Sequence, residues 1–215
     1  MSGVTDRAGK VIGVTGGIGT GKSTVCAMFQ DCGGRLIDTD RIVHWEMAHN
    51  PEMIQRIARA FGPGVLRDRR VDRSRLADIV FKEETKRRLL ESIIHPVVWA
   101  HIQGRMRQEG AKEDCWILDI PLLFETGWQR RMDATVVVTA SERTQVQRAR
   151  QRLRLSEEEV RRRLQAQMPL EEKVRLADFV IDNSGSLEET RRQVKQIWER
   201  IQFNHIGRSS NAETD

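Results

Sequence analysis

The sequence has few of the features that mark secreted and membrane proteins. Its three cysteines (Cys26, Cys32 and Cys115) include no C-x-x-C pair, and their odd number argues against a framework of disulfides. No stretch approaches the roughly 20 apolar residues that a membrane-spanning helix needs. The first ten residues lack the apolar segment of a secretory signal, and the histidines are not spaced as metal ligands. We therefore expect a cytoplasmic protein without a structural metal and without a membrane partner.

Acidic and basic residues balance along most of the chain, and an excess of one sign is confined to one segment. The 215 residues carry a net charge of +5, and 31% of them are charged. Residues 143–163 contain eight arginines and three glutamates, an excess of five that equals the net charge of the whole chain. This concentration favours an anionic partner, either nucleic acid or a phosphorylated small molecule, although a solvated helix face with Glu–Arg pairs would look the same. The segment has no aromatic residue on which a base could stack, so we expect no specific nucleic-acid binding.

Short apolar segments alternate with helical ones along most of the chain. The apolar segments are β-branched and apolar on both faces, which is typical of buried parallel strands. They are residues 11–15, 35–38, 116–119, 134–139 and 178–182. Helices are expected at residues 23–31, 141–153, 156–167 and 186–202, most of which begin near a serine that can cap the helix. The pattern predicts an α/β fold of three layers, with a five-stranded parallel sheet covered on both faces.

Residues 41–112 interrupt this alternation. They have helical character and no convincing strand, and we interpret them as a helical insert between the second and third strands. A helix near residues 83–108 contains His95-Pro96, where the proline should end or kink it. We expect a single domain over residues 11–203, with a lid at about 143–167. The ends of the chain, residues 1–10 and 204–215, are predicted to be flexible tails.

A phosphate-binding loop follows the first predicted strand. The segment from Gly16 to Ser23 fits the pattern G-x-x-x-x-G-K-[ST], and it lies between an apolar strand and a plausible helix, as such a loop should. Its backbone N–H groups can point at phosphate oxygens, Lys22 can reach the β- and γ-phosphates, and Ser23 can ligate Mg2+. The alternative is a glycine-rich turn that matches by chance. We predict a P-loop kinase that uses ATP and Mg2+, with the nucleotide held by Gly17, Ile18, Gly19, Thr20, Gly21, Lys22, Ser23 and Thr24.

Polar residues follow three other predicted strands, at the sheet edge where ligands of parallel sheets gather. Asp40, after the second strand, can accept the proton of an attacking hydroxyl or cap the next helix. Asp119 ends the third strand, in the usual place for the carboxylate that fixes Mg2+ in P-loop proteins, and it could instead cap the next turn. Asn183, after the last strand, could touch the adenine, although an ordinary Asx turn explains the local pattern better.

The arginine-rich segment follows the fourth predicted strand. Phosphoryl transfer needs positive charge on the migrating group, and small kinases often supply it from a lid. Arg148 and Arg152 are one helical turn apart, so one helix face can present both. The number of arginines exceeds what one phosphate needs, and most of them are therefore expected to face solvent or to form ion pairs.

Several separated motifs occur in order within residues 11–201. They are V-T-G-G-I-G-T-G-K-S-T, I-D-T-D, D-R-S-R-L-A-D-I-V-F, I-I-H-P, D-I-P-L-L-F-E and V-I-D-N-S-G. Together they resemble the motifs of the dephospho-coenzyme A kinase family. The first motif occurs in many families, whereas the others are more selective. The resemblance implies transfer of the γ-phosphoryl group of ATP to the ribose 3′-hydroxyl of dephospho-coenzyme A, the last step of coenzyme A synthesis. A monomer or weak homo-oligomer is expected.

The resemblance also implies roles for individual residues. Asp40 matches the proposed base of the family, Arg152 matches the lid arginine on the transferring phosphoryl group, and Lys22 is the third catalytic residue. The helical insert would be the acceptor-binding domain. Contacts to the acceptor are expected from Thr15, Asp40, Arg73, His95 and Leu122. Without the motifs of the insert, the pattern leaves open another P-loop kinase acting on a nucleoside monophosphate or a small alcohol, and more remotely a basic nucleic-acid-binding protein.

Overall fold

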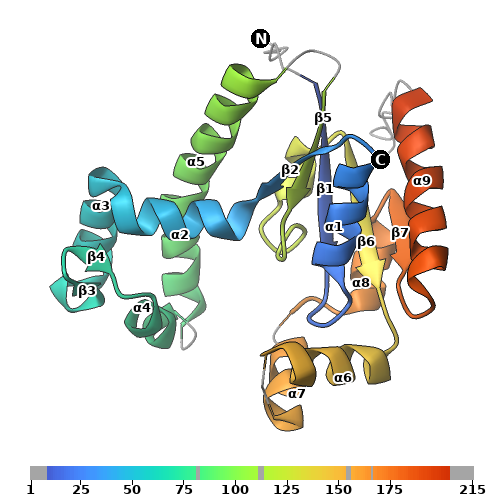
Figure 1. Ribbon diagram of the computed structural model, residues 1–215. Coiled ribbons are helices and arrows are strands. Elements are labelled where there is room, and N and C mark those ends of the chain that lie inside the picture. The colour runs from blue at the N-terminus through green and yellow to red at the C-terminus, as the bar shows by residue number, and fades with distance from the viewer. Residues whose placement is uncertain (1–8, 81–82, 111–113, 154–155, 166, 204–215) are drawn as a thin grey trace, which may run out of the picture. The chain divides into compact units, whose positions relative to one another are not determined.

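The computed structural model describes residues 9–80, 83–110, 114–153, 156–165 and 167–203 (Figure 1). Five strands form a parallel sheet in the order β2-β5-β1-β6-β7, which confirms the predicted fold class. The strands are β1 (Lys10–Gly16), β2 (Arg35–Asp38), β5 (Cys115–Asp119), β6 (Ala134–Thr139) and β7 (Phe179–Asp182). All five coincide with the predicted segments. The tails predicted at residues 1–10 and 204–215 lie outside the described residues, apart from Gly9 and Lys10, where β1 begins.

The core of the sheet lies between the central strands and two helices. Helices α1 (Lys22–Asp31) and α9 (Leu187–Phe203) pack on the same face of the sheet (Figure 1). Their apolar side chains meet those of the strands in one cluster that includes Ile12, Val14, Phe29, Val136, Ile181, Val194 and Ile201. On the other face, a Cβ atom at Gly13 would lie 2.9 Å from Met132 and 3.0 Å from Leu123, so the segment between β5 and β6 packs tightly against β1. That segment includes the 3-10 helix η2 (Trp128–Arg131).

Three helices follow β6. Helices α6 (Glu142–Leu153) and α7 (Glu157–Gln165) correspond to the two predicted there, whereas the short helix α8 (Leu170–Leu176) was not predicted. Val146, Ala149 and Val160 form a small core between α6 and α7, and Ile18 of the P-loop packs against it. Arg161 of α7 pairs with Glu142 and with Glu157, so part of the arginine excess forms the Glu–Arg pairs considered above.

The described residues divide into two compact units, one formed by residues 38–110 and the other by residues 9–37 and 114–203. The first unit covers residues 41–110 of the segment that was interpreted as an insert. It contains α2 (Thr39–His49), α3 (Pro51–Phe61), η1 (Pro63–Val65), β3 (Leu66–Arg67), β4 (Arg70–Val71), α4 (Arg73–Val80) and α5 (Glu84–Glu109). Helix α5 contacts α2, α3 and α4 and is therefore the centre of this unit.

The insert contains a hairpin that was not expected, and a proline that does not end its helix. Strands β3 and β4 form an antiparallel hairpin, whose turn residues Asp68 and Arg69 have φ values of 50° and 63°. No glycine marks this turn, so the usual sequence signal of a two-residue hairpin is missing. Helix α5 also runs through Pro96 without ending there. Its buried apolar face outweighs the loss of one backbone hydrogen bond, because packing contributes most of a helix's stability.

Candidate active site

The P-loop connects β1 to α1 and depends on two glycines in the left-handed region. Gly19 has a φ of 75° and Gly21 a φ of 86°. A Cβ atom at Gly19 would lie 2.2 Å from the backbone oxygen of Gln145, and one at Gly21 would lie 2.1 Å from Nδ2 of Asn183. Neither position has room for a side chain, and both backbones adopt a conformation that other residues rarely tolerate. The loop is therefore held in one shape by its immediate neighbours.

Replacing Gly19 by alanine should raise the KM for ATP as well as lower stability. We expect a loss of about 1–3 kcal/mol in the free energy of unfolding from the backbone strain. The clash with Gln145 should in addition displace the loop. Gly62→Ala is the matched control, because Gly62 also has a φ of 86° but no neighbour within 4 Å of the added Cβ. Urea unfolding should give a stability loss for both variants, larger for Gly19→Ala because of the clash, and ATP titrations a raised KM for Gly19→Ala alone; equal KM values would contradict this account.

A lysine and a carboxylate meet beside the loop. Lys22 begins α1 and Asp119 ends β5, and their side chains, 15% and 12% exposed, form an ion pair. Because Asp119 lies opposite Val14 in the parallel register of β5 and β1, the carboxylate reaches the sheet edge from which the P-loop starts. The structure thus brings together the two residues that were predicted from separate motifs.

Two oxygen-bearing side chains next to the P-loop suit a Mg2+ ion whose other ligands are phosphate oxygens. Ser23, in the first turn of α1, is exposed and carries a hydroxyl, and Asp119 supplies a carboxylate. Mg2+ prefers such oxygen ligands and usually keeps waters or substrate phosphates among them. No group of three or more His, Cys, Asp or Glu side chains able to hold a metal occurs within the described part of the chain. A hydroxyl and a carboxylate of this kind can share Mg2+ with the phosphates of a nucleotide.

Asn183 links the P-loop to two helices. Its side chain is buried; Nδ2 donates to the backbone oxygen of Thr20 at 2.8 Å, and Oδ1 accepts from the Thr190 hydroxyl at 2.8 Å. Its backbone oxygen accepts from the Arg148 guanidinium at 3.0 Å. The Asx turn considered from the sequence is made by the preceding residue, since Ser184 N–H donates to Asp182. Asn183 therefore braces the P-loop from the end of β7, and its amide is mostly engaged within the protein.

Gln145 is a further polar residue at the loop, and the sequence did not single it out. Its side chain is 5% exposed, and its Nε2 donates to the Ala140 oxygen at 2.8 Å. Its Oε1 is buried without a hydrogen-bond partner among the described residues, and a Cβ atom at Gly17 would lie 2.9 Å from it. A buried acceptor without a donor normally has a reason in function or in bound solvent.

Three residues predicted to belong to the lid or to contact the acceptor lie in the same unit as the P-loop. Arg152 belongs to α6, but its side chain lies outside the described part. Leu122, after β5, is 40% exposed. Thr15 is fully buried and donates its hydroxyl to the Pro121 oxygen at 3.0 Å. Thr15 therefore joins the end of β1 to the loop after β5.

In the unit of residues 38–110, Asp40 is exposed in the first turn of α2. It does not cap this helix, because Asp38 is the N-cap and accepts from the Arg41 N–H at 3.0 Å. His44 lies one turn further along α2. Burial lowers the pKa of His44, the charge of Arg73 lowers it further, and Asp40 opposes the shift. Asp40 and Arg73 thus act on the same imidazole.

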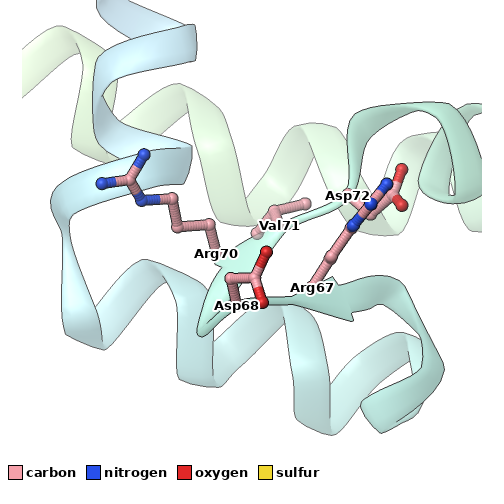
Figure 2. A pocket seen from close by; sticks show the side chains of 5 residues that line it. All are labelled: Arg67, Asp68, Arg70, Val71 and Asp72. Carbon is pink, nitrogen blue, oxygen red and sulfur yellow. The ribbon is translucent and has the colours of Figure 1, made fainter.

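Arg73 begins α4, two residues after the β3–β4 hairpin ends at Val71. Asp72, which follows β4, accepts from the backbone N–H groups of Ser74 and Arg75 at 3.1 and 3.2 Å. This capping makes Arg73 the first residue of α4. A shallow hollow on the hairpin is lined by Arg67, Asp68, Arg70, Val71 and Asp72, and Figure 2 shows the two arginine side chains extending to opposite sides. His95 is half-buried on α5.

Residues 10–189 match the family model described as dephospho-CoA kinase. The chain belongs to the dephospho-CoA kinase family. A dephospho-CoA kinase of Symbiobacterium thermophilum is 46% identical over 193 residues, which cover 88% of this chain and 80% of the relative. One from Aquifex aeolicus is 42% identical over 193 residues, covering 89% and 97%. The family predicted from the motifs is thereby confirmed.

Solved structures agree with this family membership. A dephospho-CoA kinase from Campylobacter jejuni superposes with a TM-score of 0.64 at 28% identity, over 89% of this chain and 96% of the other. A protein from Thermus thermophilus superposes with a TM-score of 0.79 at 36% identity, over 90% and 98%. A shikimate kinase from Acinetobacter baumannii shares the fold alone, with a TM-score of 0.50 at 18% identity over 91% and 94%.

Proposed function

We propose that the protein transfers the γ-phosphoryl group of ATP to the ribose 3′-hydroxyl of dephospho-CoA, giving CoA and ADP. The observation that carries the proposal is the Lys22–Asp119 pair beside a P-loop, in a chain whose residues 10–189 match the dephospho-CoA kinase family. The pair supplies a cation for the phosphates and a carboxylate for Mg2+, two of the recurring parts of sites for phosphoryl transfer.

The nucleotide side of the reaction uses the P-loop. Its backbone N–H groups and the positive end of α1 hold the phosphates, and Lys22 places its charge on the β- and γ-phosphates. Ser23 and Asp119 would hold Mg2+, which when bound neutralises the charge that develops on the phosphates. Arg152, with Arg148 one turn before it, would add positive charge to the migrating group from α6. Asn183 supports this side by fixing the Thr20 carbonyl.

The acceptor side uses residues 38–110 in this proposal. Asp40 would take the proton from the 3′-hydroxyl as the oxygen attacks the γ-phosphorus, and the bond to the β-phosphate oxygen breaks to release ADP. The exposed carboxylate of Asp40, which capping does not engage, supports this role. Arg73 and His95 would bind the acceptor, and Thr15 and Leu122 would lie beside it. The acceptor itself carries a diphosphate, for which an arginine is a suitable partner.

ADP release in the presence of Mg-ATP and a panel of acceptors tests the proposal. We expect turnover with dephospho-CoA and little with AMP or shikimate. Turnover with AMP or shikimate but none with dephospho-CoA would favour the alternative of another P-loop kinase. Titration of labelled DNA at two salt concentrations would expose a nucleic-acid-binding role as tight binding with a steep salt dependence.

We also infer action in the cytoplasm as a monomer or weak homo-oligomer. No helix within the described ranges is long and apolar enough to cross a membrane. Sedimentation of the purified full chain over a range of concentrations measures the oligomeric state.

A further inference from the structure

A lysine is buried in the short helix α8, within the same unit as the P-loop. Lys173 is 1% exposed and is among the largest fully buried side chains. Its Nζ lies 2.7 Å from Oε1 of Glu125 and donates to the Pro121 oxygen at 3.3 Å. Lysines are almost never fully buried unless they are paired, because desolvation of the ammonium is costly. We call Lys173, Glu125 and Pro121 the Lys173 clamp.

The clamp joins three segments of the unit that contains the P-loop. Pro121 follows Asp119 by two residues, and its oxygen also accepts from the Thr15 hydroxyl just before the P-loop. The other partner, Glu125, accepts from the backbone N–H of Met168 at 3.2 Å, in the segment that returns from α7 to α8. One ammonium group thus ties the end of β1, the loop after β5 and the return from the predicted lid.

An apolar side chain could fill the same space, so packing alone does not explain a charged one. Replacing buried ion pairs by apolar residues is often neutral or stabilising, which makes such a pair weak evidence for a purely stabilising role. The clamp instead fixes the direction of a backbone carbonyl two residues from Asp119. Since Asp119 pairs with Lys22, a shift of this loop would move both groups beside the phosphates.

We propose that Lys173 is a positioning residue for phosphoryl transfer, acting through the loop after β5 on the Asp119 carboxylate and through Glu125 on the return from the lid. The inference rests on the proposed function, because it assigns Asp119 to Mg2+. It goes beyond that function because it makes the reaction depend on Lys173, a residue outside both the P-loop and residues 38–110.

Lys173→Met in the full chain tests this role, since methionine has similar length and no charge. A misplacement of about 1 Å at a reacting centre can cost roughly 100-fold in rate, so we expect kcat to fall by about 10- to 100-fold. The Mg2+ concentration for half-maximal activity should rise, and the KM for dephospho-CoA should change little. Lys86→Met is the control, because the Lys86 side chain is 43% exposed and pairs with Glu83 three residues before it; it should change none of these values.

Two further variants separate positioning from stability. Lys173→Met combined with Glu125→Leu removes both charges and should recover much of the unfolding temperature, while the lowered kcat and the shifted Mg2+ dependence persist. Glu125→Gln, which keeps an acceptor for both partners, should give a smaller shift in the same direction, and it remains informative if Lys173→Met fails to fold.

The results that would overturn the role are also distinct. A lowered unfolding temperature with kcat and Mg2+ dependence within twofold of the wild type, measured well below that temperature, would leave Lys173 purely structural. Unchanged Mg2+ dependence and unchanged kcat in Glu125→Gln would likewise show that Lys173 is purely structural. A wild-type protein that phosphorylates only another acceptor would overturn the proposed function, and the Mg2+ shift would then be measured with that acceptor.

Discussion

Replacement of Lys22 by methionine is expected to lower kcat by about 10²- to 10³-fold, the usual effect of removing one group that stabilises developing charge. The ammonium lies beside the P-loop and pairs with Asp119. Its loss removes the cation on the β- and γ-phosphates and leaves the Asp119 carboxylate without this partner. The KM for ATP should rise as well, because the same charge acts on bound nucleotide. ADP release at saturating dephospho-CoA, with ATP varied, measures both changes.

Lys195→Met provides the matched control for this substitution. Lys195 is exposed on α9, so its removal should leave kcat and both KM values unchanged. A Lys22→Met protein with kcat within tenfold of the wild type would show that phosphoryl transfer depends on charge from elsewhere, and α6 would be the first place to search.

Replacement of Asp40 by asparagine is expected to lower kcat by about 10²- to 10⁴-fold, the range attributed to a general base. The substitution keeps the shape of the side chain and removes its capacity to accept a proton. The KM for ATP should stay near the wild-type value, since Asp40 belongs to α2 and not to the P-loop. Steady-state kinetics with each substrate varied in turn would separate the two effects.

Asp38→Asn is the matched control for Asp40→Asn. Asp38 caps α2 through a hydrogen bond to the Arg41 N–H, and asparagine caps helices about as well as aspartate. This variant should retain most of its activity and stability. Equal losses for both variants would mean that the geometry of α2, and not proton transfer at residue 40, limits the reaction. Full activity of Asp40→Asn would point to attack without a base.

The parts of the fold that could be predicted depend on local pattern. The five strands are apolar on both faces, and the P-loop has a motif in which every glycine has a physical purpose, so neighbouring residues alone identify them. The β3–β4 hairpin could not be identified in this way, because Asp68 and Arg69 occupy turn positions where glycine is the usual signal. Helix α5 continues through Pro96 because distant residues pack on its apolar face.

The site was predictable to the extent that its residues lie in motifs. Lys22 and Asp119 come from separate motifs and meet in the structure. By contrast, Lys173 lies in a charged stretch, Leu170–Leu176, that reads as a solvated helix. Its partner Glu125 is far away in the sequence, so only the fold explains its burial. Asn183 was a candidate for the adenine, and its buried contact with Thr20 could not be anticipated from an Asp-Asn-Ser turn.

The contact of Ile18 with α6 and α7 makes the P-loop part of a second, smaller hydrophobic core. The buried residues of this core are Val146, Ala149 and Val160, with Ile18 and Leu164 packed against them, so the loop residue contributes to the stability of the helix pair. By thermodynamic reciprocity, whatever stabilises this loop conformation also stabilises the helix pair, and a loosened pair weakens the loop by the same free energy. A nucleotide bound at the phosphate-binding loop would therefore also stabilise the arginine-rich helices through the packing of Ile18, in addition to any direct contact with their arginines.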